Sequence, residues 1–189
     1  MKSPSMRAAL PAVLLLGACA AAPDRFYALS PSPPAAQPAH PTAHLRLDVT
    51  VPSLIDRPEM VVATSQNGIL ILEHERWAAP VSDQVAEVLA RDIENERSDL
   101  LVGDRRFDQA STPTVSLKVD IVRMGAQRGG QAVLEAHWRI VDAGAGEDQL
   151  GAAVLSAPVG ADGYAAIAQA YSRLLGELAE KLAAGVRRQ

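Results

Sequence analysis

Several stretches of the chain alternate apolar and polar side chains with a period of two. From Leu45 to Val51 the odd-numbered positions are apolar and the even-numbered positions are polar, which predicts a half-buried strand that ends at Pro52. The same alternation runs through Val115–Ile121 and through Leu134–Ile140. We therefore expect three strands that each turn one face toward a core and the other toward solvent.

Shorter β-rich runs with turn residues between them predict hairpins. Met60–Thr64 and Ile69–Glu73 are separated by a stretch that contains Asn67-Gly68, and Asn-Gly favours a hairpin turn because both residues tolerate positive φ. Gly129-Gly130 marks a second turn, between two of the long alternating strands. Two further short strands are expected at Leu100–Val102 and Gly151–Ser156.

Apolar residues at helical spacing predict two amphipathic helices. The first is expected from about Pro80 to Glu96, with proline suited to the first helical position and Asp83 placed favourably for the helix dipole. The second is expected from about Tyr164 to Leu182, with Asp162 as a candidate cap and Gly185 as a candidate end.

The predicted element order is β-β-β-α-β-β-β-β-α, which indicates an α+β fold. Because hairpins dominate, we expect a mixed, mostly antiparallel sheet with both helices packed on one face. Crossovers from a helix to the next strand leave room for some parallel pairs.

The N-terminus has the organisation of a secretory signal. Its parts are two basic residues, a short apolar stretch and two small residues before the chain's single cysteine: Lys2 and Arg7, Ala8–Leu16, Gly17-Ala18 and Cys19. This apolar stretch is under half of the ~20 residues that a membrane-spanning helix needs. The pattern predicts a bacterial lipoprotein signal over residues 1–18, cleavage between Ala18 and Cys19, and lipidation of Cys19.

An ordinary secretory signal is the alternative, because Ala18-Cys19-Ala20 and Ala20-Ala21-Ala22 both fit a small-residue cleavage site. The lone cysteine, at the position that a lipoprotein signal requires, favours lipidation. A diacylglyceryl group brings two acyl chains, and two chains hold a protein stably on a bilayer. Ala20, rather than an aspartate, follows the cysteine, which in enteric-type bacteria favours the outer membrane, with the protein facing the periplasm.

A proline-rich segment separates the cysteine from the first long strand. Ser30–Pro41 has five prolines in twelve residues and no apolar periodicity, which is typical of a polyproline linker. We expect a lipidated N-terminus and tether at residues 19–43, with a reach of up to about 74 Å, and a single domain at residues 44–189. Phe26–Leu29 interrupts the tether, either as an unattached apolar patch or as a short strand docked on the domain; docking is slightly favoured.

Composition and motif searches exclude several classes of function. The formal net charge of −4 at pH 7 does not fit a nucleic-acid-binding protein, which presents a basic face. His74-Glu75 lacks the second histidine of a zinc-protease helix, and the chain has no Gly-x-Ser-x-Gly sequence. Gly144-Ala145-Gly146 is interpreted as a hairpin loop, since no third glycine follows. We expect no catalytic residue, no metal site and no cofactor.

Two stretches stand out without matching a catalytic pattern. Asp56-Arg57-Pro58 lies in an irregular connection after the first strand, and Pro58 restricts Arg57 to extended backbone. These residues either shape a surface that docks a partner, or they only cap backbone groups and keep the link between two strands exposed to solvent. Trp77, three residues before Pro80, either belongs to such a surface or packs onto the start of the first helix; packing is favoured.

The segment Val51–Val61, with the sequence V-P-S-L-I-D-R-P-E-M-V, resembles a motif of the ABC-type transport auxiliary lipoprotein family, the PqiC-like proteins. Asn67-Gly68 and Arg76–Pro80 (R-W-A-A-P) are similar to the hairpin and the helix entry of that family. Tyr27-Ala28-Leu29 is similar to its Y-x-L sequence. With the lipoprotein signal, these matches cover nearly the first half of the chain; the second half is similar only in its strand and helix pattern.

The resemblance implies a non-enzymatic, lipid-anchored accessory subunit of an envelope transport system. Family members work with an MCE-domain protein of an inner-membrane complex, in some systems with an ABC permease and ATPase. They move lipids or other hydrophobic molecules between the inner and outer membranes. By analogy the resemblance also implies a homo-oligomeric ring, and it makes Asp56, Arg57, Pro58 and Trp77 candidate residues of a docking surface.

Two other functions remain open from the residues alone. An outer-membrane assembly or stress lipoprotein of similar α+β architecture would bind another envelope protein or lipopolysaccharide. A lipid-anchored enzyme would need a cleft of titratable residues, which the sequence does not indicate.

Overall fold

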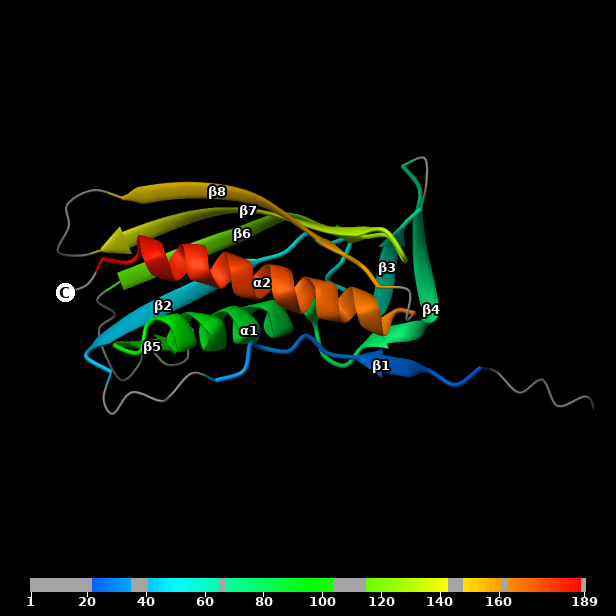
Figure 1. Ribbon diagram of the computed structural model, residues 1–189, viewed down its shortest axis with the longest axis horizontal. Helices are drawn as coiled ribbons and strands as arrows, with labels where there is room; N and C mark the ends of the chain where they lie inside the picture. Colours follow the sequence, from blue (N-terminus) through cyan, green and yellow to red (C-terminus); the bar gives the residue numbers. More distant parts are fainter. Residues whose placement is uncertain are drawn as a thin grey trace, which may run out of the picture.

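The computed structural model describes residues 22–34, 41–64, 67–103, 115–142, 148–160 and 163–187 of the 189-residue chain. Figure 1 shows an elongated molecule in which a large sheet carries both helices and a small sheet stands at one end. The elements in chain order are β1 (Arg25–Tyr27), β2 (Ala43–Thr50), β3 (Glu59–Ala63), β4 (Ile69–Trp77), α1 (Val81–Glu96), β5 (Leu100–Gly103), β6 (Val115–Ala126), β7 (Gln131–Asp142), β8 (Gln149–Pro158) and α2 (Ala165–Gly185).

The large sheet has the strand order β5-β2-β6-β7-β8. Strands β6, β7 and β8 form an antiparallel meander, whereas β2 pairs in parallel with both β5 and β6. The parallel pairing of β2 with β5 arises because α1 carries the chain back between them. The predicted element order and the mixed, mostly antiparallel strand pairing are confirmed.

A β-bulge in β6 explains why this strand continues past its predicted end. The buried positions are odd-numbered from Val115 to Ile121, and the bulge between Ile121 and Arg123 changes the register. Met124 and Ala126 are therefore buried on the same face, although their numbers are even. The strand keeps its inner face through this change of sequence pattern.

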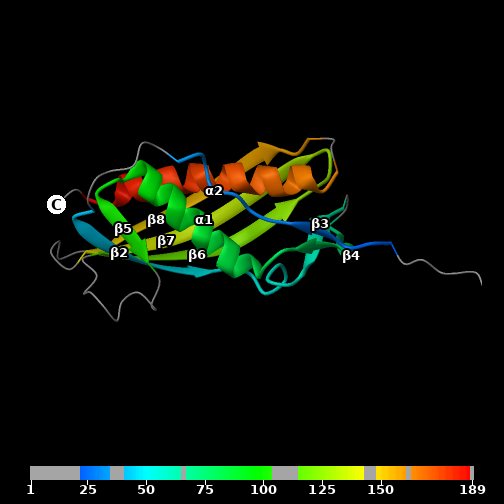
Figure 2. The ribbon, with the colours of Figure 1, turned by 90° about the horizontal axis from the view of Figure 1, so that it is seen from below.

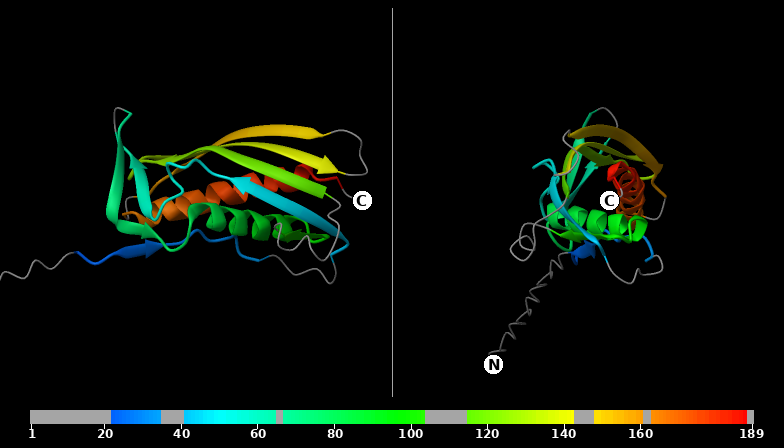
Figure 3. Two further views of the ribbon diagram at one scale, coloured as in Figure 1. Left: turned by 180° about the vertical axis from the view of Figure 1, so that it is seen from behind. Right: turned by 90° about the vertical axis from the view of Figure 1, so that its left-hand side faces the viewer.

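Both helices lie on the same face of the large sheet, as predicted (Figure 2). Their apolar stripes at helical spacing face the sheet and each other, and in the end-on view of Figure 3 the sheet curves around them. The largest fully buried side chains of the resulting core are Leu45, Met60, Leu89, Ile93, Leu117, Ile121, Leu134, Ile140, Ile167, Leu174, Leu175 and Leu178.

Arg97 connects the C-terminal ends of the two helices. Its side chain is buried and pairs with Asp99, with 2.8 Å between Nη2 and Oδ2. Nη1 also donates to the carbonyl oxygens of Ala183, at 3.3 Å, and Val186. Carbonyls at a helix C-terminus lack partners within the helix, so the guanidinium satisfies α2 where it ends.

The small sheet has the order β1-β4-β3 and lies at one end of the molecule (Figures 1 and 3). Strands β3 and β4 form the predicted antiparallel hairpin. Asn67 at its turn has a φ of 61°, the left-handed conformation that asparagine tolerates better than most residues. β1 pairs in parallel with β4, with Tyr27 opposite Trp77, so the apolar N-terminal segment docks as a short strand.

Three expectations need correction. The strands form two sheets rather than one, and β4 extends to Trp77 instead of ending at Glu73. The expected tether at residues 19–43 is wrong for residues 25–33, because this segment is bound to the domain by contacts that are described below. We call residues 25–33 the N-terminal strap. Ala18, Cys19, Asp162 and the Gly144–Gly146 loop lie outside the described residues.

Candidate functional site

The loop at residues 52–58 joins β2 to the small sheet and is folded tightly on itself. The backbone N–H groups of Ile55 and Asp56 donate to the carbonyl of Pro52 at 3.0 and 3.2 Å. The carboxylate of Asp56 accepts a hydrogen bond from the backbone N–H of Ser82, at 3.0 Å. Pro80 at the helix N-cap has no side-chain oxygen to do this, so Asp56 acts as a distant cap for α1.

Arg57 and Arg76 both point at Glu59. The Nε of Arg57 lies 2.9 Å from Oε2 of Glu59, and Nη1 of Arg76 lies 3.5 Å from Oε1. The hydrogen bond from Arg57, together with the charges of both arginines, lowers the pKa of the Glu59 carboxyl. The pair is partly solvent-exposed, so its contribution to stability is small and its charges remain available to a partner.

Trp77 is a core residue in this structure. Its side chain is 6% exposed and its ring lies 6.3 Å from that of Tyr171, at an angle of 38°, within the range of a favourable aromatic pair. Its backbone N–H donates to the carbonyl of Pro58 at 2.7 Å. The favoured packing role therefore matches its position, and its side chain lines a small cavity together with Ile55 of the 52–58 loop.

The structure thus brings all four candidate residues into one region. Asp56 and Pro58 are exposed, Arg57 is half-buried and Trp77 is beneath them. Leu54, with a 47% exposed side chain, adds an apolar residue to the same loop. We call Leu54, Asp56, Arg57 and Pro58 the loop surface; their role in docking a partner stays a prediction.

The N-terminal strap begins with ionic and hydrogen-bonded contacts to β4. The carboxylate of Glu75 is buried beneath this segment; it accepts a hydrogen bond from the Tyr27 hydroxyl at 2.5 Å and pairs with Arg25 at 3.0 Å. Burial, with a further effect of Glu75, raises the pKa of the Tyr27 hydroxyl. The carbonyl of Tyr27 accepts a hydrogen bond from Ala78 at 2.8 Å, which extends the pairing to the start of α1.

Beyond β1 the strap runs along the two helices and is held by side chains from both. Leu29 is buried, and its backbone N–H donates to Oε1 of Gln84 on α1 at 2.8 Å. The N–H of Ser30 donates to the hydroxyl of Ser172 on α2 at 3.0 Å. The N–H of Ser32 donates to Oδ1 of Asp92 on α1 at 2.7 Å.

Gln84 and Asp92 hold the strap, although neither is among the residues that the sequence singles out. They occupy buried sites on the core-facing side of α1, at 7% and 2% exposure. The available signal was two polar residues on an otherwise apolar helical stripe, since buried polar groups need hydrogen-bond partners. Their partners lie far away in the sequence, which the periodicity of α1 cannot reveal.

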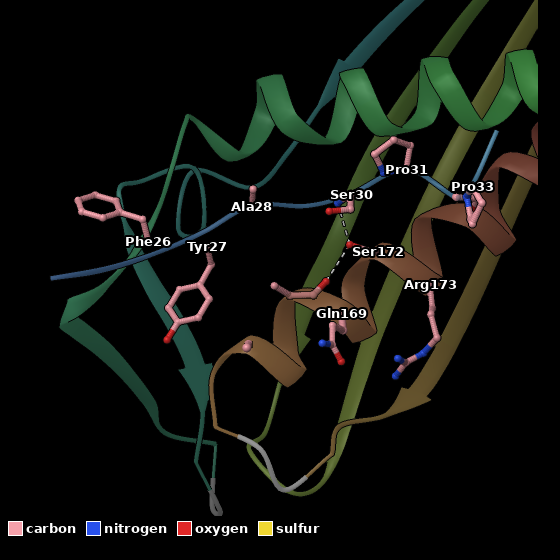
Figure 4. Close-up of a pocket in the computed structure, with 12 residues that line it drawn as sticks. Phe26, Tyr27, Ala28, Ser30, Pro31, Pro33, Gln169, Ser172 and Arg173 are labelled. Carbon is pink, nitrogen blue, oxygen red and sulfur yellow. Dashed lines mark hydrogen bonds between the residues drawn. The ribbon is translucent and has the colours of Figure 1, made fainter.

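A groove of about 560 Å³ lies between the strap and α2 (Figure 4). Figure 4 shows Phe26 and Tyr27 pointing to opposite sides of the strap. Of the labelled residues on α2, Ser172 points toward the strap, whereas Gln169 and Arg173 point away from it. Its walls mix proline, alanine and serine with a few polar side chains. Among the described residues that line it, Tyr27 and Arg173 have titratable side chains.

Within the described residues, no group of three or more histidine, cysteine, aspartate or glutamate side chains is placed to hold a metal ion. In the same ranges, none of the helices combines the length and the hydropathy of a membrane span.

Comparisons with known proteins agree with this architecture. The family model described as the ABC-type transport auxiliary lipoprotein component matches residues 27–183. The fold is similar to the crystal structure of an uncharacterized protein, with a TM-score of 0.74 and 16% identity, covering 88% of this chain and 100% of that chain. It is also similar to protein XCC0632 from Xanthomonas campestris, of family DUF330, with a TM-score of 0.65 and 18% identity, covering 84% of this chain and 92% of that one. No curated protein matches the sequence.

Proposed function

Because the chain belongs to the ABC-type transport auxiliary lipoprotein family, we propose that it is the lipid-anchored, non-enzymatic subunit of an envelope transport system built on an MCE-domain protein. Family membership itself establishes an auxiliary component of transport and indicates a membrane-anchored location in the envelope. In the proposed system, acylated Cys19 holds the chain on the outer membrane, facing the periplasm. The complex moves lipids or other hydrophobic molecules between the two membranes.

The family match over residues 27–183 is the observation that carries this proposal. The matched range begins in the strap, at Tyr27, and includes the loop surface and Trp77. In the described part of the chain, two groups of polar residues hold the strap and the 52–58 loop in place. A rigid body with a firmly held N-terminus suits a part that links a membrane to a partner protein.

The loop surface is the proposed site of contact with the MCE-domain protein. The Arg57–Glu59 pair offers charges of both signs beside the apolar side chain of Leu54, a combination typical of protein interfaces. Trp77 acts from beneath, by fixing the loop's shape.

Lipidation is tested by mass spectrometry and membrane fractionation of the wild type and the Cys19→Ala variant. We expect the wild type to carry a diacylglyceryl mass and to be recovered with outer membranes, and the variant to be soluble. A wild type that lacks the lipid mass would contradict the anchoring.

The partner is tested by crosslinking and affinity purification of the tagged full-length protein. We expect an MCE-domain protein to be recovered, and its yield to fall with Arg57→Glu. The matched control is Arg123→Glu, since Arg123 also pairs with a glutamate, Glu135, at 3.6 Å, on a different surface. Recovery of an outer-membrane assembly protein in place of an MCE protein would overturn the proposal and favour an assembly or stress lipoprotein.

Self-association into a ring is also proposed, and β8 is the element that favours it. β8 is an edge strand of the large sheet, and it has no charged residue from Gln149 to Pro158. Leu150 and Val154 on it are 73% and 65% exposed. Edge strands without charges are ready to pair with another chain.

A further inference from the structure

Next to the turn of the β3–β4 hairpin, β4 begins with three consecutive exposed aliphatic residues. Ile69, Leu70 and Ile71 are 52%, 49% and 39% exposed. Successive residues of a strand point to opposite faces, so both faces of β4 are apolar near its tip. We call these three residues the hairpin patch. Figures 1 and 3 show the hairpin standing away from the helices at its end of the molecule.

The hairpin patch differs from the neighbouring part of the same strand in charge. From Asn67 to Leu72 the sequence N-G-I-L-I-L has no charged residue, whereas Glu73, His74, Glu75 and Arg76 follow directly. The paired residues of the opposite strand β3 are buried at Met60, Val61 and Val62, so the exposed aliphatic side chains of this hairpin lie on β4. An uncharged stretch of aliphatic residues next to the turn, with charged residues farther along the strand, is the arrangement of a segment that enters a bilayer interface, where charged groups are costly and aliphatic groups are favourable.

The N-terminal chain enters the domain beside this hairpin. Asp24 is tied to β4 by its contact with His74, with 2.9 Å between Oδ1 and Nδ1, and Arg25 is tied to Glu75. Asp24 is five residues after Cys19 in the sequence, so the two Cα atoms are at most about 18 Å apart, whatever the path between them. From His74 to Leu70 the strand advances about 13 Å. The hairpin patch therefore lies within the reach of the lipid anchor.

The strap explains why this geometry is fixed. With residues 25–33 bound to β4, α1 and α2, the length that separates lipid from domain is set by residues 20–24 alone. A domain held this closely cannot stay clear of the bilayer, and its apolar surface nearest the anchor will face the lipid. Phe26 on β1, with a 63% exposed ring, adds an aromatic side chain to the same end.

We propose that the hairpin patch inserts into the lipid bilayer that holds Cys19, as a second membrane contact that orients the domain. This inference rests on the lipidation of Cys19 in the proposed function. The lipid bilayer is the occupant that the short anchor and the uncharged tip favour. The C-terminal end of α2 and β5, at the opposite end of the molecule in Figure 1, then points away from the membrane.

The test places an environment-sensitive fluorophore on the lipidated full-length protein in vesicles of phosphatidylethanolamine and phosphatidylglycerol at 3:1. Because Cys19 is acylated, Leu70→Cys supplies the one labelling site. Leu101→Cys is the matched control, a leucine 37% exposed on β5 at the far end. We expect a blue-shifted emission from position 70, quenched at least about fivefold more by lipid-borne doxyl groups than emission from position 101.

Equal quenching at the two positions would overturn the proposal, as would a blue shift at position 70 that depends on added protein partner instead of vesicles.

A second variant, Leu70→Asp, tests the contribution of this side chain to membrane binding. It is made in the unlipidated Cys19→Ser background and measured by sedimentation with the same vesicles. We expect its partition coefficient to fall about fivefold relative to the Cys19→Ser parent, since a half-exposed leucine has about half of its apolar area left to bury, whereas Leu101→Asp leaves it unchanged. An unchanged coefficient with Leu70→Asp would also overturn the proposal. The mass of lipid on Cys19 is read separately, so failure of the anchor and failure of the hairpin contact are distinguished.

Discussion

Two buried polar side chains fix the position of the N-terminal strap on the domain. Gln84 and Asp92 interrupt the apolar stripe of α1, and each accepts a hydrogen bond from a strap backbone N–H. Gln84 also donates from Nε2 to the carbonyl of Ala79, at 2.8 Å, which fixes the direction of its amide. A buried polar group that is left without a partner costs more than the hydrogen bond itself contributes, so these positions specify the docked strap.

We predict that Gln84→Ala loosens the strap and lowers the free energy of unfolding by about 1–3 kcal/mol, because the N–H of Leu29 loses its acceptor in a buried site. Urea denaturation measures the loss, and hydrogen exchange should show faster exchange of the Leu29 amide. The matched control is Gln169→Ala, an exposed glutamine on α2, which should change neither. Unaltered exchange at Leu29 would contradict the role assigned to Gln84.

The burial of Asp92 leads to a second prediction, which concerns how the free energy of unfolding depends on pH. Burial raises the pKa of its carboxyl above the ordinary value of 3.8, against the opposing effect of the hydrogen bond from Ser32. Its Oδ2 has no hydrogen-bond partner within the described ranges. A raised pKa in the folded state means that this group favours folding most below pH 3.8 and that this contribution is lost as the pH rises through the raised pKa.

We therefore expect the wild type to lose stability relative to Asp92→Asn as the pH is raised from about 3.5 to 7. The asparagine keeps an oxygen for Ser32 but cannot ionise. The measurement is the difference between the two unfolding free energies, since the other carboxyl groups cancel in it. A difference that stays constant over this range would contradict the inference.

At the scale of elements, β7 and β8 show how a glycine makes room for a large side chain. Gly151 on β8 is paired with Trp138 on β7. A Cβ atom at Gly151 would lie 2.2 Å from Cε2 of Trp138, far inside van der Waals contact. The indole therefore rests on the glycine, and the partly buried Trp138 packs against the core from the end of the sheet where the helices finish.

We predict that Gly151→Ala destabilises the protein by about 1–3 kcal/mol, because the tryptophan or the strand must shift. The control is Gly125→Ala on β6, where an added Cβ would have no atom within 4 Å. That change should be neutral or stabilise by up to about 1 kcal/mol, since alanine loses less backbone entropy than glycine on folding. Thermal unfolding of both variants measures the contrast, and equal effects would contradict it.

The elements themselves were largely predictable, and their pairing was not. Period-two and helical patterns predict β2, β6, β7, α1 and α2, because an element with one buried face needs apolar residues at a regular spacing along its own sequence. The sequence does not predict the last part of β4, because its consecutive charged residues lack the apolar alternation of a strand. Glu75 is buried there through its contacts with Tyr27 and Arg25. The split into two sheets depends on which strands pair, which no single stretch encodes.

The sequence singles out one part of the candidate site, the 52–58 loop with Trp77, but not the strap, whose contacts are far apart in the sequence. The 52–58 loop and Trp77 stood out from their local sequence, and the structure brings them together. The strap was misjudged as a tether because prolines favour an extended, unpaired backbone. The extended conformation is compatible with docking: Leu29 and Ser30, just before Pro31, and Ser32, between Pro31 and Pro33, donate their N–H groups to side chains of α1 and α2.

At the scale of the whole molecule, the two ends have different surfaces. One end carries the strap entry, the hairpin patch and the small sheet, and the other carries the C-terminal end of α2 (Figure 1). Along one side, β8 leaves an uncharged edge of the large sheet open. The loop surface borders the small sheet, because Arg57 pairs with Glu59 on β3. A membrane in contact with the hairpin patch and identical neighbours along the sides would leave the far end to other partners.

We predict that Val154→Lys weakens self-association about tenfold, because a charge on an edge strand opposes pairing with another chain. Its effect on monomer stability should stay within about 0.5 kcal/mol, as for other exposed sites. Sedimentation velocity over a concentration series measures the assembly, and Val122→Lys, 42% exposed on an inner strand of the same sheet, is the control. A wild type that remains monomeric throughout would contradict pairing through β8.

The parallel pairing of β1 with β4 has a mechanical consequence. In Figures 1 and 3 the described chain enters β1 along the strand direction, so a pull arriving from the N-terminus acts along the strand axis. In that direction the contacts of β1 with β4 are loaded together, in shear, and the Arg25–Glu75 and Asp24–His74 pairs share the load. A pull at right angles would open them one at a time. The small sheet is thus arranged to transmit tension between a membrane and the domain without breaking the contacts between β1 and β4 one after another.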